Sequence, residues 1–232
     1  MPEKFDFERA WLEKLSNCLR AYAGDDVRDL VMEGSEGLSS DTEPLEVIHW
    51  SQSAMDRLEG AVDEGTVKKV MTRCACQYPK SNLRDLREEY KVTGDIVLVH
   101  RKLQERFEIF LRETLGLEED MVLEVVDRGW GTAGMLEGDR ITATKIPKSG
   151  YLEEYLKEGD RERRRQIYCH CPRVRNALEL SEELPKSYCY CGAGFYKGIW
   201  EEILQEPVEV EILESVLSGD DVCKVAVYLP SA

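Results

Sequence analysis

The sequence predicts an α+β fold in which N-terminal helices pack on a C-terminal antiparallel β-sheet with helices and share one core with it. Three observations predict this. Apolar side chains recur at helical spacing over much of residues 6–127, residues 129–147 are rich in glycine and β-branched residues, and residues 207–230 alternate on either side of a Gly219-Asp220 turn. We therefore expect a helical region at 1–128 and an α+β metal- and ligand-binding region at 129–232.

The N-terminal region divides into helices separated by turn residues. Apolar residues recur every three or four positions over 6–22, and Cys18, which lies beside that stripe, is predicted to be a buried structural thiol. Glycines and serines between 24 and 40 mark a break. Further helices are expected over about 43–63, 66–72, 82–90, 95–115 and 118–127, with Asp95 as a cap. His49 is predicted to be a packed core or surface side chain, and His100 a surface one.

The C-terminal region contains the predicted strands. Residues 129–147 are expected to form a hairpin that turns at Gly138. The glycines at 129–134 lack the strand-to-helix context and the lysine of a phosphate-binding loop, which argues against a nucleotide site. Short charged helices are expected over 151–167, and an amphipathic helix right after Cys191. A strand, a turn and a second strand that carries Cys223 end the chain.

Charge argues against one class of partner. The chain holds 31 Lys and Arg against 46 Asp and Glu, a net charge of -15, whereas nucleic-acid binding normally needs a basic surface. Six arginines nevertheless surround one cysteine pair. They form either a solvated helix face paired with neighbouring Glu, or an anion site or counter-charge for a thiolate-rich centre. These arginines are Arg161, Arg163, Arg164, Arg165, Arg173 and Arg175.

The sequence also predicts a cytoplasmic protein without a membrane partner. No apolar run approaches the roughly 18 residues that cross a bilayer. The acidic, amphipathic start MPEKFDFERAWLEKL is unlike a signal peptide. A small-molecule ligand is the expected partner, with a homodimer left open.

The cysteines carry the strongest functional signal. Eight are many for a compartment in which disulfides do not persist. Six of them form three C-x-C pairs, a spacing too tight for a disulfide between the two members but suited to one metal or to neighbouring atoms of a cluster. Together with His170 and Cys223, the pairs are the predicted metal ligands. These ligands are Cys74, Cys76, Cys169, His170, Cys171, Cys189, Cys191 and Cys223.

Thiolates suit zinc or an iron–sulfur cluster, and the sequence leaves both open. The two pairs separated by 17 residues, Cys169/Cys171 and Cys189/Cys191, form the strongest unit. Cys74 and Cys76 join it only if the helical region folds back over it. Two other interpretations are free thiols packed as small hydrophobic groups and a thiol redox centre activated by cations or by a helix N-terminus.

The stretch CGAGFYKGIWEEILQEPVEVEILESVLSGDDVCKVAVYLP resembles the vinyl-reductase-type small-molecule-binding domain of bacteriochlorophyll biosynthesis proteins and phenol-sensing regulators. The resemblance covers roughly residues 187–230. The segments GDIVLVHRKLQERF, GWGTAG, ATKIP and CHCPRVR are similar to uncharacterised bacterial and archaeal proteins, some of which are labelled L-2-amino-thiazoline-4-carboxylic acid hydrolase.

This resemblance implies a zinc ion held by three cysteines and a glutamate beside an apolar ligand pocket. By position, Cys189 or Cys191 matches the first ligand and Cys223 the last. The middle cysteine falls at Ser215, and the glutamate falls near Ile212, with Glu211 and Glu214 flanking it. The zinc site of the relatives is therefore incomplete in this chain, and the additional C-x-C pairs are expected to rebuild a metal centre nearby.

Two functions follow from these observations. The first is a cysteine-ligated metal protein, with zinc or an iron–sulfur cluster, that binds a small apolar or aromatic molecule. The alternative is a metal-dependent enzyme, a hydrolase or redox catalyst, that acts on a small anionic substrate. The sequence does not decide whether the protein is an enzyme, because it contains no other catalytic motif.

Overall fold

The computed structural model describes residues 5–230 and confirms the α+β fold. The N-terminal helices are α1 (Phe7–Ala23), α2 (Asp25–Met32), α3 (Pro44–Ala61), α4 (Glu64–Arg73), α5 (Arg84–Thr93), α6 (Ile96–Ile109) and α7 (Glu119–Asp127). The later helices are α8 (Leu152–Lys157), α9 (Arg161–Tyr168), α10 (Pro172–Leu180) and α11 (Tyr190–Leu204). The strands are β1 (Met135–Glu137), β2 (Arg140–Thr144), β3 (Glu209–Glu214) and β4 (Lys224–Tyr228). Short 3-10 helices are η1 (Lys80–Leu83), η3 (Ser149–Tyr151), η4 (Lys186–Cys189) and η5 (Val216–Ser218). One π-helical segment, η2 (Phe110–Thr114), follows α6.

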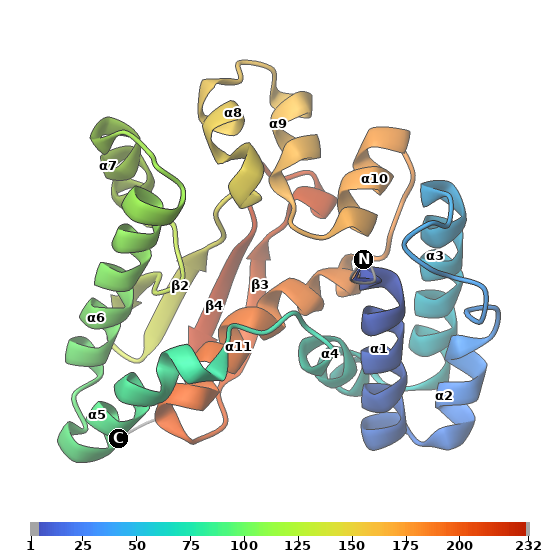
Figure 1. Ribbon diagram of the computed structural model, residues 1–232. Helices are drawn as coiled ribbons and strands as arrows, with labels where there is room; N and C mark the ends of the chain where they lie inside the picture. The colour runs from blue at the N-terminus through green and yellow to red at the C-terminus, as the bar shows by residue number, and fades with distance from the viewer. Residues whose placement is uncertain (1–4, 231–232) are drawn as a thin grey trace.

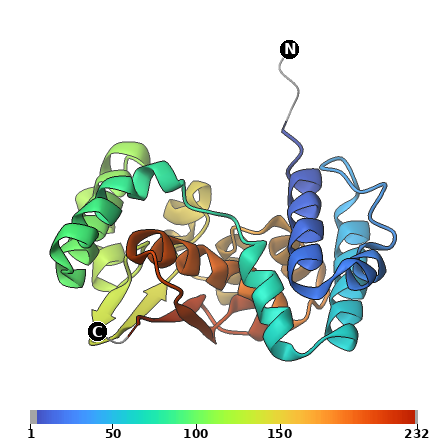
Figure 2. The same cartoon turned by 90° about the horizontal axis from the view of Figure 1, so that it is seen from below.

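Helix α11 runs through the middle of the molecule (Figure 1). The antiparallel sheet, in the order β1-β2-β4-β3, packs against it through β3 and β4. Helices α1 to α4 gather on one side of α11 and α5 to α7 on the other, as the view from below also shows (Figure 2). No helix among residues 5–230 is long and apolar enough to span a bilayer.

Most of the predicted elements form where the local sequence favours them. The Asp95 carboxylate accepts a hydrogen bond of 2.9 Å from the Leu98 amide at the start of α6, as the sequence predicted. Gly138 turns the β1–β2 hairpin at a φ of 64°. The predicted start of α11, right after Cys191, is too late: the helix begins at Tyr190, and Cys191 lies in its first turn. Helices α2 and α10 were missed, although Pro172 opens α10 in the first-turn position where proline is favoured.

The two predicted regions share their buried interior. One buried cluster joins Leu15 and Leu58 of the N-terminal helices to Tyr168 and Tyr188 of the C-terminal region. A second joins residues of α5 and α6 to the sheet and to Trp200 of α11. Within the described residues, 1–128 and 129–232 therefore share buried side chains in two clusters, so neither region has a separate interior of its own.

A close approach of α4 and α11 sets the position of both helices. Gly194 faces the C-terminal end of α4, and a Cβ atom at this position would overlap the Thr72 carbonyl oxygen and lie 2.7 Å from the Ala75 Cβ. Arg73 reinforces the contact with two hydrogen bonds, of 2.8 and 3.2 Å, to the Glu201 carboxylate. Only glycine therefore allows the two helices to pack at this spacing.

Replacing Gly194 by Ala should push α11 away from α4. We expect a loss of about 1–3 kcal/mol in the free energy of unfolding, the usual cost of overpacking a core. Urea unfolding followed by circular dichroism measures this loss. Gly198→Ala is the matched control, because nothing lies within 4 Å of a Cβ there and alanine favours the helix. Equal stability of the two variants would contradict the close contact.

A buried ion pair fastens α1 to α10. The Arg173 guanidinium, 1% exposed, donates a hydrogen bond to the Glu8 carboxylate and lies 3.9 Å from the centre of the Trp11 ring. It also lies within 3.4 Å of the Tyr188 hydroxyl. Burial raises the pKa of Glu8 even though Arg173 acts against the rise. The pair therefore holds the N-terminal helix in place at a desolvation cost.

Arg173→Met should leave the Glu8 carboxylate buried without a partner. Breaking a buried pair in this way costs about 3–5 kcal/mol in the free energy of unfolding. Lys157→Met serves as the control, since Lys157 and Glu153 form an exposed pair on α8 that should contribute no more than about 0.5 kcal/mol. Similar unfolding midpoints in urea for the two variants would show that the buried pair does not fix α1.

Candidate metal centre

Seven of the eight cysteines come together from four separate segments. The first two lie at the end of α4 and in the loop after it, and two more lie between α9 and α10. Another two lie where η4 runs into α11, and the last directly precedes β4. All eight cysteines are free thiols. The seven are Cys74, Cys76, Cys169, Cys171, Cys189, Cys191 and Cys223.

Four of these, which we call the sheet-side thiols, lie nearest the strands: Cys169, Cys171, Cys189 and Cys223. Burial and then the charges of Cys223, Cys171 and Cys189 raise the pKa of Cys169 well above its ordinary value, although Lys145 opposes the rise. Burial, followed by the charge of Cys223, raises the pKa of Cys189 to about 12. Burial is also the first cause that raises the pKa of Cys223, so Cys169, Cys189 and Cys223 all favour the protonated form.

The other three, the helix-side thiols, are Cys74, Cys76 and Cys191. A hydrogen bond from Cys74 lowers the pKa of Cys191 to about 6, and the same bond raises the pKa of Cys74 well above its ordinary value. The Cys74 Sγ also lies 3.3 Å from the Met71 carbonyl oxygen, which competes for its single proton. Cys76 is the only exposed residue of the seven, yet local burial and then the charges of Cys191 and Cys171 raise its pKa.

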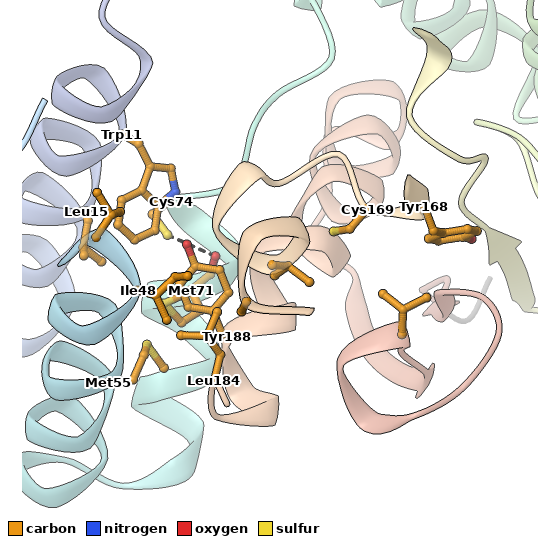
Figure 3. Close-up of a cluster of buried hydrophobic side chains, with 14 of the residues drawn as sticks. Trp11, Leu15, Ile48, Met55, Met71, Cys74, Tyr168, Cys169, Leu184 and Tyr188 are labelled. Carbon is orange, nitrogen blue, oxygen red and sulfur yellow. Dashed lines mark hydrogen bonds between the residues drawn. The ribbon is translucent and has the colours of Figure 1, made fainter. Parts of the chain in front are cut away.

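Aromatic and charged side chains enclose the thiols. The Tyr188 hydroxyl lies 3.8 Å from the Cys171 Sγ, and the Trp11 indole hydrogen-bonds to Cys191. Figure 3 shows Cys74 beside Trp11 on the side of α1, and Cys169 beside Tyr168 on the side of the sheet. The centre thus lies between the helical side and the sheet, with aromatic rings on both sides.

Ser215, which the sequence resemblance sets against the middle zinc cysteine, also lies at this centre. It is 2% exposed, and its hydroxyl is 3.0 Å from the Cys189 Sγ and hydrogen-bonds to Cys223. The flanking carboxylates are engaged elsewhere: Glu211 accepts from Tyr228 at 2.7 Å and Glu214 pairs with Lys224 at 2.6 Å. In this structure, neither flanking carboxylate is therefore free of another partner.

His170 lies between two of the cysteines but uses its Nε2 atom for the backbone. That atom is 3.1 Å from the Ile146 carbonyl oxygen. Burial, with help from the nearby Lys145, lowers the pKa of His170 to about 4, which keeps the ring neutral. The ring orients the loop between α9 and α10 rather than turning this nitrogen toward the thiols.

Lys145 is the central cation that the sequence did not single out. It directly follows β2, and four thiols act on it: Cys169, Cys223, Cys191 and Cys171. Burial alone would lower its pKa, but the thiolate charges raise it above the ordinary value. The only sequence feature that could have pointed to Lys145 was its position in ATKIP, at the end of a predicted strand.

The thiols do not form a ready-made site for one metal ion. Among residues 5–230, no three Cys, His, Asp or Glu side chains lie close enough together to hold a single ion. Thiolates on one zinc lie at about 2.3 Å from it, so they lie at most about 4.6 Å from each other. The donor set is nevertheless soft, which is the chemistry that zinc and iron–sulfur clusters prefer.

The arginines near the cysteines mostly pair with neighbouring groups. Arg161 donates to Asp221 at 2.6 Å, Arg163 to Glu154 at 3.1 Å and Arg165 to Glu162 at 2.8 Å. Arg175 donates to the Cys169 and His170 carbonyl oxygens at 2.8 and 3.0 Å. These contacts favour the interpretation as a paired helix face over an anion site.

His49 and His100 have partners outside the seven-cysteine centre, whereas Cys18 neighbours Cys74, on whose pKa its charge acts. His49 is exposed and lies 3.4 Å from Glu182, within the predicted range of roles. The surface role predicted for His100 is wrong: its ring is half-buried, stacks on Trp200 and lies 2.9 Å from the Gly134 carbonyl oxygen. Cys18 is half-buried against the core rather than fully buried, and burial raises its pKa.

Comparison with known proteins adds one finding. A family of unknown function, DUF6144, matches residues 143–231. The match includes Lys145 and five of the seven cysteines. It begins after Cys74 and Cys76, which therefore lie outside it. No curated protein and no solved structure matches the chain.

Proposed function

We propose that this chain is a cytoplasmic metal protein whose C-x-C cysteines hold a cluster of the iron–sulfur type, and that it has a cleft that binds a small apolar or aromatic molecule. The observation that carries the proposal is the convergence of seven thiols from four chain segments around Lys145. When bound, the cluster supplies one-electron redox chemistry. The cytoplasm is the compartment in which such thiols stay reduced.

Charge supports a metal over free packing thiols. Cys191, whose pKa is lowered to about 6, supplies a negative charge near the partly buried Lys145 ammonium, and a bound metal would ionise further thiols around it. No carboxylate among residues 5–230 forms an ion pair with it. Metal binding removes the thiol protons and supplies further negative charge, at a cost that the metal–sulfur bonds offset. The raised thiol pKa values thus describe a site in which protons occupy the place of the metal.

The number of thiols supports a cluster over one zinc ion. The sheet-side thiols supply four ligands, the usual number for an iron–sulfur cluster. Lys145 lies between them and Cys191 of the helix-side thiols. We assign the cluster to Cys169, Cys171, Cys189 and Cys223, with the helix-side thiols as its immediate neighbours or additional ligands.

A cleft of about 500 Å³ is the proposed small-molecule site. Its apolar surface includes Val62, Val67, Tyr190 and Ile212, and polar residues of η4 and η5 line its edge. No cysteine lines the cleft, but Tyr190 stands between Cys189 and Cys191 in the chain and so connects the cleft wall to the cysteine-bearing segment. The volume suits a drug-sized or smaller ligand. A larger hollow of about 760 Å³ lies over α3, but it is open, acidic and away from the seven cysteines.

Replacing Cys189 and Cys191 together by Ser should remove most of the bound metal. Each change removes a thiolate, one from each group, and the fold loses the stabilisation that metal binding provides. Iron, zinc and acid-labile sulfide per chain, measured on protein purified without oxygen, test this, together with the visible absorption spectrum and melting temperature. We expect iron, sulfide and absorbance near the blue in the wild type and their loss in the variant.

Cys18→Ser is the matched control, because Cys18 on α1 neighbours Cys74 but is not one of the proposed ligands. It should keep both metal content and spectrum. A colourless wild type that contains zinc would reject the cluster in favour of a zinc site. A Cys189/Cys191 variant that keeps its metal stoichiometry and melting temperature would refute the metal centre itself.

Ile212→Glu should weaken binding of a neutral apolar dye such as Nile red by tenfold or more. The new carboxylate would stand in the cleft near Glu59 and Glu64, where it is poorly compatible with an apolar guest. Leu213→Glu is the control, since Leu213 is exposed and does not line the cleft. If both variants bind the dye as the wild type does, the cleft is not the apolar site.

A further inference from the structure

The cleft of about 500 Å³ lies between two walls that come from different parts of the chain. The first wall is the junction of α3 and α4, whose apolar side chains there are Val62 and Val67. The second wall is formed by η4, the first residue of α11, β3 and η5, with Tyr190 and Ile212 as its apolar surface. An apolar or aromatic body between the walls therefore finds apolar contacts on both sides.

The two walls carry charges of opposite sign. The charged side chains that line the first wall are Glu59 and Glu64, whereas Lys186 is the charged side chain that lines the second. Glu59 already has a partner from the opposite wall, because its carboxylate accepts a hydrogen bond from the Ser187 hydroxyl. One carboxylate, that of Glu64, and one ammonium, that of Lys186, are left.

Glu64 and Lys186 are both exposed, and within residues 5–230 neither side chain forms an ion pair or a hydrogen bond. Glu64 is close enough to Tyr190 for its charge to add to burial in raising the pKa of that hydroxyl. The other cation near the Tyr190 ring, Lys68, lies 5.8 Å from the ring centre and pairs with Glu209 at 3.6 Å. The first wall thus offers a free carboxylate and the second a free ammonium.

We propose that the ligand of this cleft is a zwitterion with an apolar or aromatic body, whose ammonium contacts Glu64 and whose carboxylate contacts Lys186. The inference rests on the proposed function, since it specifies the molecule that the cleft binds. An uncharged guest displaces water from both charged side chains without replacing the lost hydrogen bonds, and a guest with one charge leaves one of them unpaired. A zwitterion satisfies both. The Ser218 hydroxyl, on the same wall as Lys186, offers the carboxylate a further donor.

The test uses three probes that share an indole ring and differ in charge. Tryptophan is a zwitterion, tryptamine lacks the carboxylate, and indole-3-propionate lacks the ammonium. Displacement of Nile red from the purified protein measures the affinity of each probe for the wild type, for Lys186→Met and for Glu64→Gln. Lys157→Met and Glu113→Gln are the charge-matched controls, because both residues are exposed and neither lines the cleft. Circular dichroism confirms that each variant is folded.

Tryptophan should bind the wild type about threefold more tightly than either of the other two probes, the scale expected of a partly exposed ion pair. In Lys186→Met its advantage over tryptamine should disappear, while its advantage over indole-3-propionate remains. Glu64→Gln should show the reverse. Both controls should keep both advantages. This crossed pattern distinguishes a contact with each side chain from an effect of net charge.

A wild type that binds Nile red, with binding weakened in Ile212→Glu, but that shows no preference for tryptophan would refute the zwitterion and leave the cleft as the apolar site. A preference that persists in both Lys186→Met and Glu64→Gln, or that disappears equally in the two controls, would refute it as well. Tighter binding of tryptamine or indole-3-propionate than of tryptophan would show a ligand of a single charge. If the wild type does not bind Nile red, or Ile212→Glu binds it equally, the proposed small-molecule site fails and this inference with it.

Discussion

The packing of α11 on α4 is the constraint on which the rest of the structure depends. At Gly194 the two helices approach so closely that no side chain fits between them, and Arg73 and Glu201 bridge the same contact. This approach brings the end of α4 to the first turn of α11. Cys74 and Cys191 are far apart in the chain and lie together only because of it. The centre is therefore a product of tertiary packing between two regions.

The surroundings of the thiols explain how the fold tolerates so many of them. Most are buried or half-buried, and burial is the main cause of their raised pKa values. Ser215, Tyr188 and Trp11 satisfy individual sulfur atoms with hydrogen bonds. Lys145 contributes the one fixed positive charge that acts on both thiol groups. A bound metal centre would exchange several protons for several metal–sulfur bonds without changing this framework.

The sequence alone predicts the elements better than the site. Strong periodicity and caps such as Asp95 locate most helices and both hairpin turns, because these signals are local. Helix α2 lay hidden in a glycine-rich stretch, and α10 follows a cysteine pair that reads as a loop. His100 was misplaced because its burial depends on Trp200, a residue 100 positions away. Lys145 was missed for a similar reason. The raised pKa of its ammonium depends on cysteines from three other segments, and no spacing in the sequence connects them to it.

The most direct measurement is X-ray absorption at the metal edge of protein purified without oxygen. If thiolates and inorganic sulfide surround the metal, the first shell contains only sulfur, at about 2.3 Å, with a second metal beyond it. We predict this result for iron. A sulfur-only shell around zinc with no second metal would replace the cluster by a single ion. A first shell of oxygen and nitrogen atoms would contradict the account, because the seven cysteines would then not be the ligands.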